Sequence, residues 1–152
     1  MSLAFLVIAL CCSALGAGGA YTTLFSLSPA GQTKEAWVKQ MQHAIPRIGV
    51  PLFVVQPIAA LSTVASAVLT RGESPAFWFF GSATAFFAAA AIITRLVHIP
   101  INVRLTAMGS DPLSDSFASV QRRWWRFHVV RSAALFLGLL ALVFGALTRM
   151  RA

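Results

Sequence analysis

The chain has 152 residues, of which 58% are hydrophobic and only 11% are charged. Soluble globular domains carry about 25% charged residues, so this composition excludes an ordinary soluble domain and predicts an integral membrane protein. The formal net charge is +8. Because the basic residues lie between apolar runs and at the C-terminus, they fit topology signals near lipid headgroups, and we expect a lipid bilayer and no nucleic acid as partner.

The first apolar run covers residues 2–25. No basic segment precedes it, and it is longer than the apolar part of a secretory signal, which predicts an uncleaved first span. Residues 16–21 of this run, GAGGAY, have small side chains that permit close packing of helices. The same small side chains could instead leave room for a flat ligand.

The first connection covers residues 28–48 and contains Trp37, Met41 and Ile45 at a spacing of four. This spacing gives one apolar helical face, which predicts a short amphipathic helix lying on the membrane surface. His43 lies in the same connection. It either faces headgroups and solvent or serves as a cofactor ligand.

The remaining spans are predicted at residues 48–70, 76–99 and 127–149. Pro51 and Pro57 lie inside the second span, and we expect them to bend it because proline lacks a backbone donor.

The third connection is polar, and Asp111 or Ser114 could cap a second short amphipathic helix there. The predicted fold is therefore all-α. We expect one domain, residues 1–152, that forms a four-helix transmembrane bundle with short amphipathic helices in the first and third connections.

An up-and-down bundle places the first and third connections on the same side, so all three histidines are expected near one membrane face. These two connections also carry most of the lysines and arginines. The positive-inside rule then predicts that both connections are cytoplasmic and both termini outside, in what we expect to be a bacterial inner membrane.

Polar side chains gather where the third span ends. Arg95, His98 and Asn102 are three and four residues apart, so they would share one face of a continuous helix. Pro100 falls inside this stripe and leaves the carbonyl of Leu96 without its usual donor. Because polar groups at membrane depth are costly and generally serve a function, this junction is the candidate site.

A second polar stripe opens the fourth span, where Trp124, His128 and Arg131 recur at four and three. Imidazole binds transition metals and haem iron and also serves as a general base, while arginine binds carboxylates, phosphates and haem propionates. The alternative is structural, since arginine and tryptophan at span ends also anchor helices at the headgroups.

Two motifs connect this chain with a known family. A P-x-N element, Pro100 and Asn102, closes the third span, and an R-W-x-x-x-H-x-x-R element opens the fourth with Arg123, Trp124, His128 and Arg131. Together with four apolar spans and a glycine-rich first span, this pattern resembles the DUF1772 family, which includes the fungal anthrone oxygenases.

The resemblance implies a membrane oxidoreductase that oxidises a small aromatic, anthrone-like substrate with molecular oxygen. By this resemblance His128 would be the base that removes an acidic proton. Arg131 and Asn102 would stabilise the resulting oxyanion, and Trp124 would stack on the substrate ring.

A bound cofactor is the competing interpretation. His98 and His128 could be axial haem ligands, or ligands of another transition metal, with Arg95 or Arg131 on the propionates. Alternatively, no cofactor beyond molecular oxygen is needed. The residues expected near a cofactor are His98, Arg95, Trp124 and His43.

A different class of function also fits the sequence. The chain could be a non-enzymatic membrane protein, such as a transporter subunit, a lipid-binding protein or an assembly partner. In either class we expect a small aromatic or quinone-like molecule, lipid, or a second copy of the chain as partner.

Overall fold

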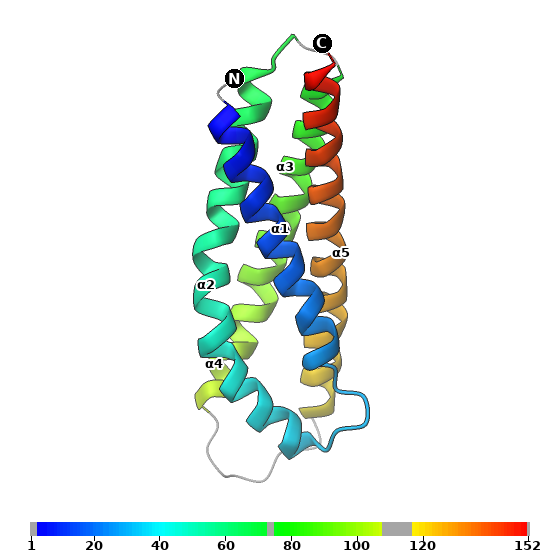
Figure 1. Cartoon of the computed structure of the whole chain (residues 1–152). Coiled ribbons are helices and arrows are strands. Elements are labelled where there is room, and N and C mark those ends of the chain that lie inside the picture. The colour runs from blue at the N-terminus through cyan, green and yellow to red at the C-terminus, as the bar shows by residue number, and fades with distance from the viewer. Residues whose placement is uncertain (1–2, 73–74, 108–116, 152) are drawn as a thin grey trace.

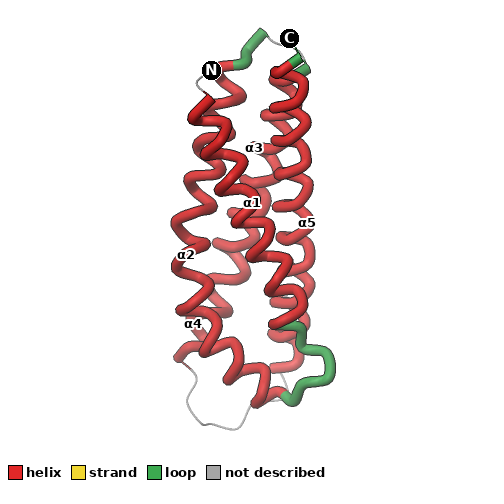
Figure 2. The backbone as a smooth tube through the Cα atoms, viewed as in Figure 1, coloured by secondary structure: helices red, strands yellow, loops and turns green. Residues whose placement is uncertain are grey.

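The computed structural model describes residues 3–72, 75–107 and 117–151, and this part of the chain contains helices and no strand (Figure 2). The elements in chain order are α1 (Leu3–Ser26), α2 (Lys34–Leu69), α3 (Ala76–Ile93), the π-helical turn η1 (Thr94–His98), α4 (Ile99–Ala107) and α5 (Phe117–Met150). The prediction of an all-α fold is confirmed.

Four stretches are long and apolar enough to cross a membrane: Leu3–Ser26, Pro51–Leu69, Ala76–Ala107 and Phe117–Met150. Figure 1 shows them side by side in an up-and-down bundle, with the start of α1 and the end of α5 at the same end. Large apolar side chains such as Phe25 and Leu61 are exposed on the outside of the bundle. In a bilayer these side chains face lipid, so the chain is an integral membrane protein.

The first connection differs from its prediction because α2 already begins at Lys34 and continues without a break into the span. Thr33 caps this helix by accepting a hydrogen bond from the Ala36 amide at 3.2 Å. Trp37 and Met41 are fully buried in the protein, and the Trp37 indole donates to the Leu27 carbonyl at 3.0 Å. The separate surface helix was therefore a wrong prediction, since its apolar face packs on the bundle instead of on lipid.

The fourth helix also begins earlier than predicted, at Phe117. Phe117 and Trp124 are buried in a cluster with Trp37 from α2, so residues that were assigned to a polar connection are held by aromatic packing. Asp111 and Ser114, the predicted caps, lie outside the described residues.

A π-helical turn interrupts the third span just before Pro100. Proline has no amide hydrogen, so a regular helix cannot continue its bonding here. Instead the Ile99 amide donates to the Thr94 carbonyl, five residues back. The inserted residue rotates Arg95 away from His98, so the prediction that Arg95 shares a face with His98 and Asn102 was wrong.

The closest helix packing lies between α3 and α5. Phe87 of α3 faces Gly138 of α5, and Phe80 faces Gly145; a Cβ atom at Gly138 would lie only 2.5 Å from the Phe87 ring. Both phenylalanines are buried. We call these four residues the glycine seam, because small residues let the helices approach closely in a membrane.

The packing of α2 on α5 contrasts with the close packing of α3 on α5. α2 packs on α1 and α3 but touches α5 only weakly. Pro46, Pro51 and Pro57 all lie inside it, and Figure 1 shows its lower part turned across the end of the bundle. Prolines bend a helix by removing backbone hydrogen bonds, and along this bent stretch α2 forms one wall of two cavities.

Candidate functional site

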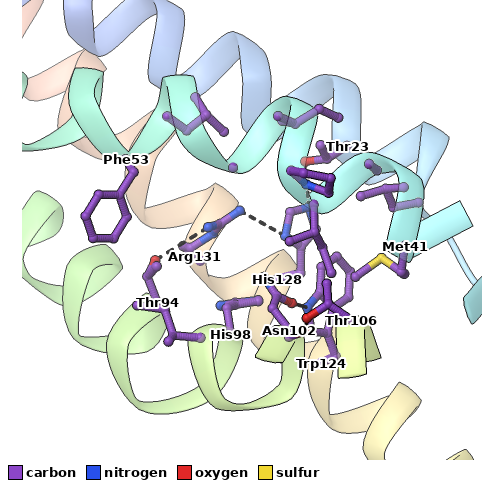
Figure 3. Close-up of a pocket in the computed structure, with 18 of the residues that line it drawn as sticks. Thr23, Met41, Phe53, Thr94, His98, Asn102, Thr106, Trp124, His128 and Arg131 are labelled. Atoms are coloured by element: carbon purple, nitrogen blue, oxygen red, sulfur yellow. Dashed lines mark hydrogen bonds between the residues drawn. The ribbon is translucent and has the colours of Figure 1, made fainter. Parts of the chain in front are cut away.

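A cavity of about 330 Å³ lies near the end of the bundle where α1 ends and α5 begins (Figure 3). Its walls come from α1, α2, the π-turn, α4 and α5. Most of the lining is apolar, but each of these five elements contributes at least one polar side chain. Those that matter for the chemistry are Thr23, Thr94, His98, Asn102, His128 and Arg131.

His128 has both ring nitrogens in hydrogen bonds. Its Nδ1 lies 3.2 Å from Nη2 of Arg131, and its Nε2 lies 2.9 Å from Oγ1 of Thr23. Because a guanidinium only donates, Nδ1 must accept, and Nε2–H donates to Thr23. The Thr23 hydroxyl in turn donates to the Ala20 carbonyl at 2.8 Å. The network therefore assigns one neutral tautomer to a fully buried imidazole.

Trp124 supports this imidazole from one side. Its ring stacks on His128 with centroids 4.7 Å apart and an interplanar angle of 11°. The Trp124 indole N–H donates to Oδ1 of Asn102 at 3.0 Å, and so orients that amide. The sequence resemblance implied that Trp124 stacks on a substrate ring, but in the structure its face lies against His128.

His98 differs from His128 in the hydrogen bonding of its ring nitrogens. It is only 2% exposed, yet neither of its ring nitrogens has a hydrogen-bond partner among the described residues. Its ring centroid lies 5.8 Å from that of His128. Buried polar atoms are nearly always paired, and an unpaired one costs stability, so such an exception points to a missing ligand or a catalytic role.

Two other buried nitrogens in the cavity wall share this property. Nε of Arg131 and Nε2 of Gln56 are buried without a partner in the described part of the chain, and both residues line the cavity. The rest of the Arg131 guanidinium lies between Thr94 and His128 (Figure 3), with Nη1 at 3.4 Å from the Thr94 hydroxyl. Arg131 is the one charged side chain among the residues that line this cavity. The site is therefore electropositive and suits an anion.

The structure brings together five of the seven residues that the sequence proposed: His98, Asn102, Trp124, His128 and Arg131 all line this cavity. His43 is exposed and not part of the lining. Arg95 is also exposed and lines a second, neighbouring cavity.

Sequence reasoning missed Thr23, Thr94 and Gln56. Thr23 is a single hydroxyl in an apolar run, with no periodic or charged neighbour to mark it. Thr94 precedes His98 by four residues, as His98 precedes Asn102, so this spacing was the signal that could have found it. Gln56 is the one amide of its span, but a single amide in a span can equally hydrogen-bond to a neighbouring helix, so the sequence does not place it in the site.

The two histidines do not fit the bis-imidazole site expected for haem or another metal. Both nitrogens of His128 are engaged by Thr23 and Arg131, and a guanidinium beside a ligand atom disfavours a cation there. His98 is the one of the pair that could ligate without breaking a hydrogen bond. Among the described residues, no group of three His, Cys, Asp or Glu side chains could hold a metal ion.

In a comparison with protein families, the model of the anthrone oxygenase family matches residues 46–141. The chain belongs to the anthrone oxygenase family. This is the DUF1772 family that the sequence motifs resemble, and membership supports a membrane oxygenase-like function. The matched segment includes His98, His128 and Arg131 but not Thr23 of α1. Searches of curated proteins and of solved structures gave no match.

Proposed function

We propose that this protein is a membrane oxygenase that oxidises a small, acidic aromatic compound of the anthrone type with molecular oxygen, without a metal or haem. The observation that carries this proposal is the buried His98, whose ring nitrogens have no hydrogen-bond partner in the described part of the chain, beside the cationic Arg131 in one cavity. A free base next to a fixed positive charge is what formation of a substrate anion requires.

His98 is the better candidate for the base than His128. A base needs an available lone pair, and the lone pair of His128 accepts from Arg131, whereas His98 keeps a free one. In this assignment His128 is a positioning residue. Held between Thr23 and the face of Trp124, it keeps the guanidinium of Arg131 in place.

Arg131 and Asn102 would bind the anion. When a proton leaves the carbon opposite the carbonyl of an anthrone, the charge moves onto the carbonyl oxygen, which becomes a phenolate. An arginine in a cavity of low dielectric stabilises such an oxygen strongly. Asn102 is oriented by Trp124 and can donate from its amide nitrogen.

The oxidation itself needs only the anion and molecular oxygen. The carbanion gives electrons to O₂ and a C–O bond forms; the peroxide anion takes the proton back from His98. Loss of water from this hydroperoxide leaves a ketone, so one CH₂ and one O₂ become one C=O and one H₂O. The protein supplies the base, the charge and an apolar cavity in which the partners meet.

Oxygen uptake by the detergent-purified protein with anthrone tests this proposal. We expect His98→Gln to lower kcat/KM about 10²–10⁴-fold, because a general base is lost. His43→Gln is the matched control, since His43 is exposed and outside the cavity. Wild-type uptake no faster than the uncatalysed reaction, or full activity of His98→Gln, would overturn the proposal.

The same samples test the absence of a metal or haem. Optical absorption and elemental analysis are compared with turnover across several preparations. Turnover that scales with the content of haem or of a transition metal would contradict the cofactor-free reaction. Intact binding of anthrone without any turnover would instead favour the non-enzymatic alternative.

A further inference from the structure

A second cavity of about 500 Å³ lies between α1, α2, α3 and α5. Its α2 wall lies in the stretch Pro51–Leu69, which is one of the membrane spans. The lining is dominated by small or apolar residues such as Gly16, Ala60, Phe87 and Ala91. A space of this size and character within the bilayer suits a hydrocarbon group.

The two cavities meet at a common wall. Leu52, Phe53, Gln56, Thr94 and Ile99 line both of them. Gln56 lies at this boundary, and its buried Nε2 has no partner among the described residues. The two cavities are therefore adjacent, so the polar groups around His98 lie next to an apolar region of the bundle.

The sequence explains why this space stays open. Pro57 lies in α2 and lines the second cavity, and prolines bend a helix. Across the space, α2 touches α5 only weakly. The opposing positions Ala60 and Ala91 carry methyl groups, so no bulky side chain from these two positions fills the gap.

We propose that the second cavity holds a single long alkyl or isoprenoid chain carried by the substrate, whose aromatic ring lies beside His98 and Arg131. This inference rests on the proposed function and narrows its substrate class to an anthrone-type ring that carries an apolar tail. The first cavity, which holds His98 and Arg131, alone fits a ring, and the second cavity alone fits any hydrocarbon. Their adjacency, with five lining residues in common, favours a molecule that has both parts, and such a molecule is already dissolved in the membrane.

The gain in affinity expected from the tail is not the gain that the same tail would give when it enters a soluble protein from water. Moving a methylene from water into a cavity strengthens binding about fourfold, but a membrane-dissolved chain is already among other chains. The gain comes from filling a space that otherwise lacks partner atoms. Filling that space with protein should therefore weaken binding of the tailed compound and leave the tail-less one unaffected.

The test uses a photoreactive probe, an anthrone with a decyl chain that ends in a diazirine. Irradiated under nitrogen with the purified full-length protein, it should label residues of the second cavity, and decyl anthrone should compete. Labelling outside this cavity would overturn the inference. So would labelling that a diacyl phospholipid suppresses but decyl anthrone does not, because the site would then hold a lipid.

Two variants on opposite walls, Ala60→Leu and Ala91→Leu, are expected to reduce labelling at least about fivefold by occupying the space. Ala89→Leu is the matched control on α3, because Ala89 is exposed and lines neither cavity. Circular dichroism melting identifies which variants are folded, and labelling is measured for each folded variant. Unchanged labelling in a folded filling variant would overturn the inference.

Kinetics separate this inference from the proposed function. Turnover of anthrone should stay within about twofold in the two filling variants, whereas KM for an anthrone bearing a decyl chain should rise about fivefold. Equal KM values for tailed and tail-less anthrone in the wild type would overturn the tail site alone. If no substrate turns over, the labelling experiment still decides the tail site.

Discussion

Two regions of the same helix, α5, have opposite character. Toward its C-terminal end, Gly138 and Gly145 bring it against phenylalanine rings of α3 with no room for even a methyl group. Toward its N-terminal end, His128 and Arg131 face a cavity. One part of α5 is therefore closely packed against α3, and the other part borders a cavity.

The difference separates stability from chemistry within one helix. The glycine seam buries only apolar atoms and can hold α3 and α5 together by dispersion contacts. In the cavity half, nitrogens of His98, Arg131 and Gln56 lack hydrogen-bond partners among the described residues, which costs stability. Such a cost is expected at a functional site, and the seam gives the bundle the stability to tolerate it.

Removing the cavity charge should have the largest effect. Arg131→Met is expected to lower kcat/KM for anthrone about 10²–10³-fold, as loss of an oxyanion donor does, while leaving the melting temperature unchanged or higher. Arg126→Met is the control, because Arg126 is exposed on the same helix. Oxygen uptake and thermal melting are the measurements, and joint loss of fold and activity would contradict the division between the two regions.

A change in the seam should do the reverse. The Cβ of Gly138→Ala would lie 2.5 Å from the Phe87 ring, so we expect destabilisation by about 1–3 kcal/mol with normal activity in the folded fraction. Gly81→Ala is the control, because a Cβ there meets nothing within 4 Å. Unfolding in mixed micelles measures the stability of both variants. A Gly138→Ala protein as stable as the wild type would mean that the glycine seam is not closely packed.

The unpaired imidazole provides a sharper test. His98→Leu removes two buried nitrogens that have no partner within the residues that the structure describes, so it should stabilise the protein by about 1–3 kcal/mol while abolishing turnover. His43→Leu, at an exposed site, should change neither quantity. Micelle unfolding and oxygen uptake are measured on the same samples. Destabilisation by His98→Leu would show that the ring has partners.

The smallest effect is expected at the edge of the cavity. Thr23→Val removes the acceptor of the His128 Nε2–H and should cost about 0.5–1.5 kcal/mol, with a few-fold loss of kcat/KM as Arg131 becomes less well held. Thr22→Val is the neighbouring control, because Thr22 is exposed and its hydroxyl donates to the Gly18 carbonyl of its own helix. Equal effects of the two substitutions on unfolding and on turnover would remove Thr23 from the site.

The number and order of the spans could be predicted because bilayer thickness dictates the length of an apolar run. The predicted helix ends failed where tertiary packing decided them. The apolar face of Trp37 and Met41 was recognised correctly, but the spacing of residues cannot say whether such a face meets lipid or protein. Phe117 was assigned to a polar connection for the same reason, since its burial depends on a partner from another helix.

The candidate site was predictable where polar residues stand out within apolar runs, as His98, His128 and Arg131 do. Arg95 was placed on the wrong face because the argument assumed a regular period of 3.6 residues, which the π-turn breaks. The roles within the site depend on hydrogen bonds to Thr23 and Thr94. Those contacts join different helices and leave no trace in the local pattern.

The π-turn also has an evolutionary consequence. A single inserted residue rotates everything on one side of it by about 100° relative to the other side. The half of the third span that meets α5 through Phe80 and Phe87 could thus keep its surface while the half that carries His98 and Asn102 was re-aimed. A one-residue insertion or deletion at this point is therefore a short route by which relatives can exchange the side chains that line the cavity without rebuilding the bundle.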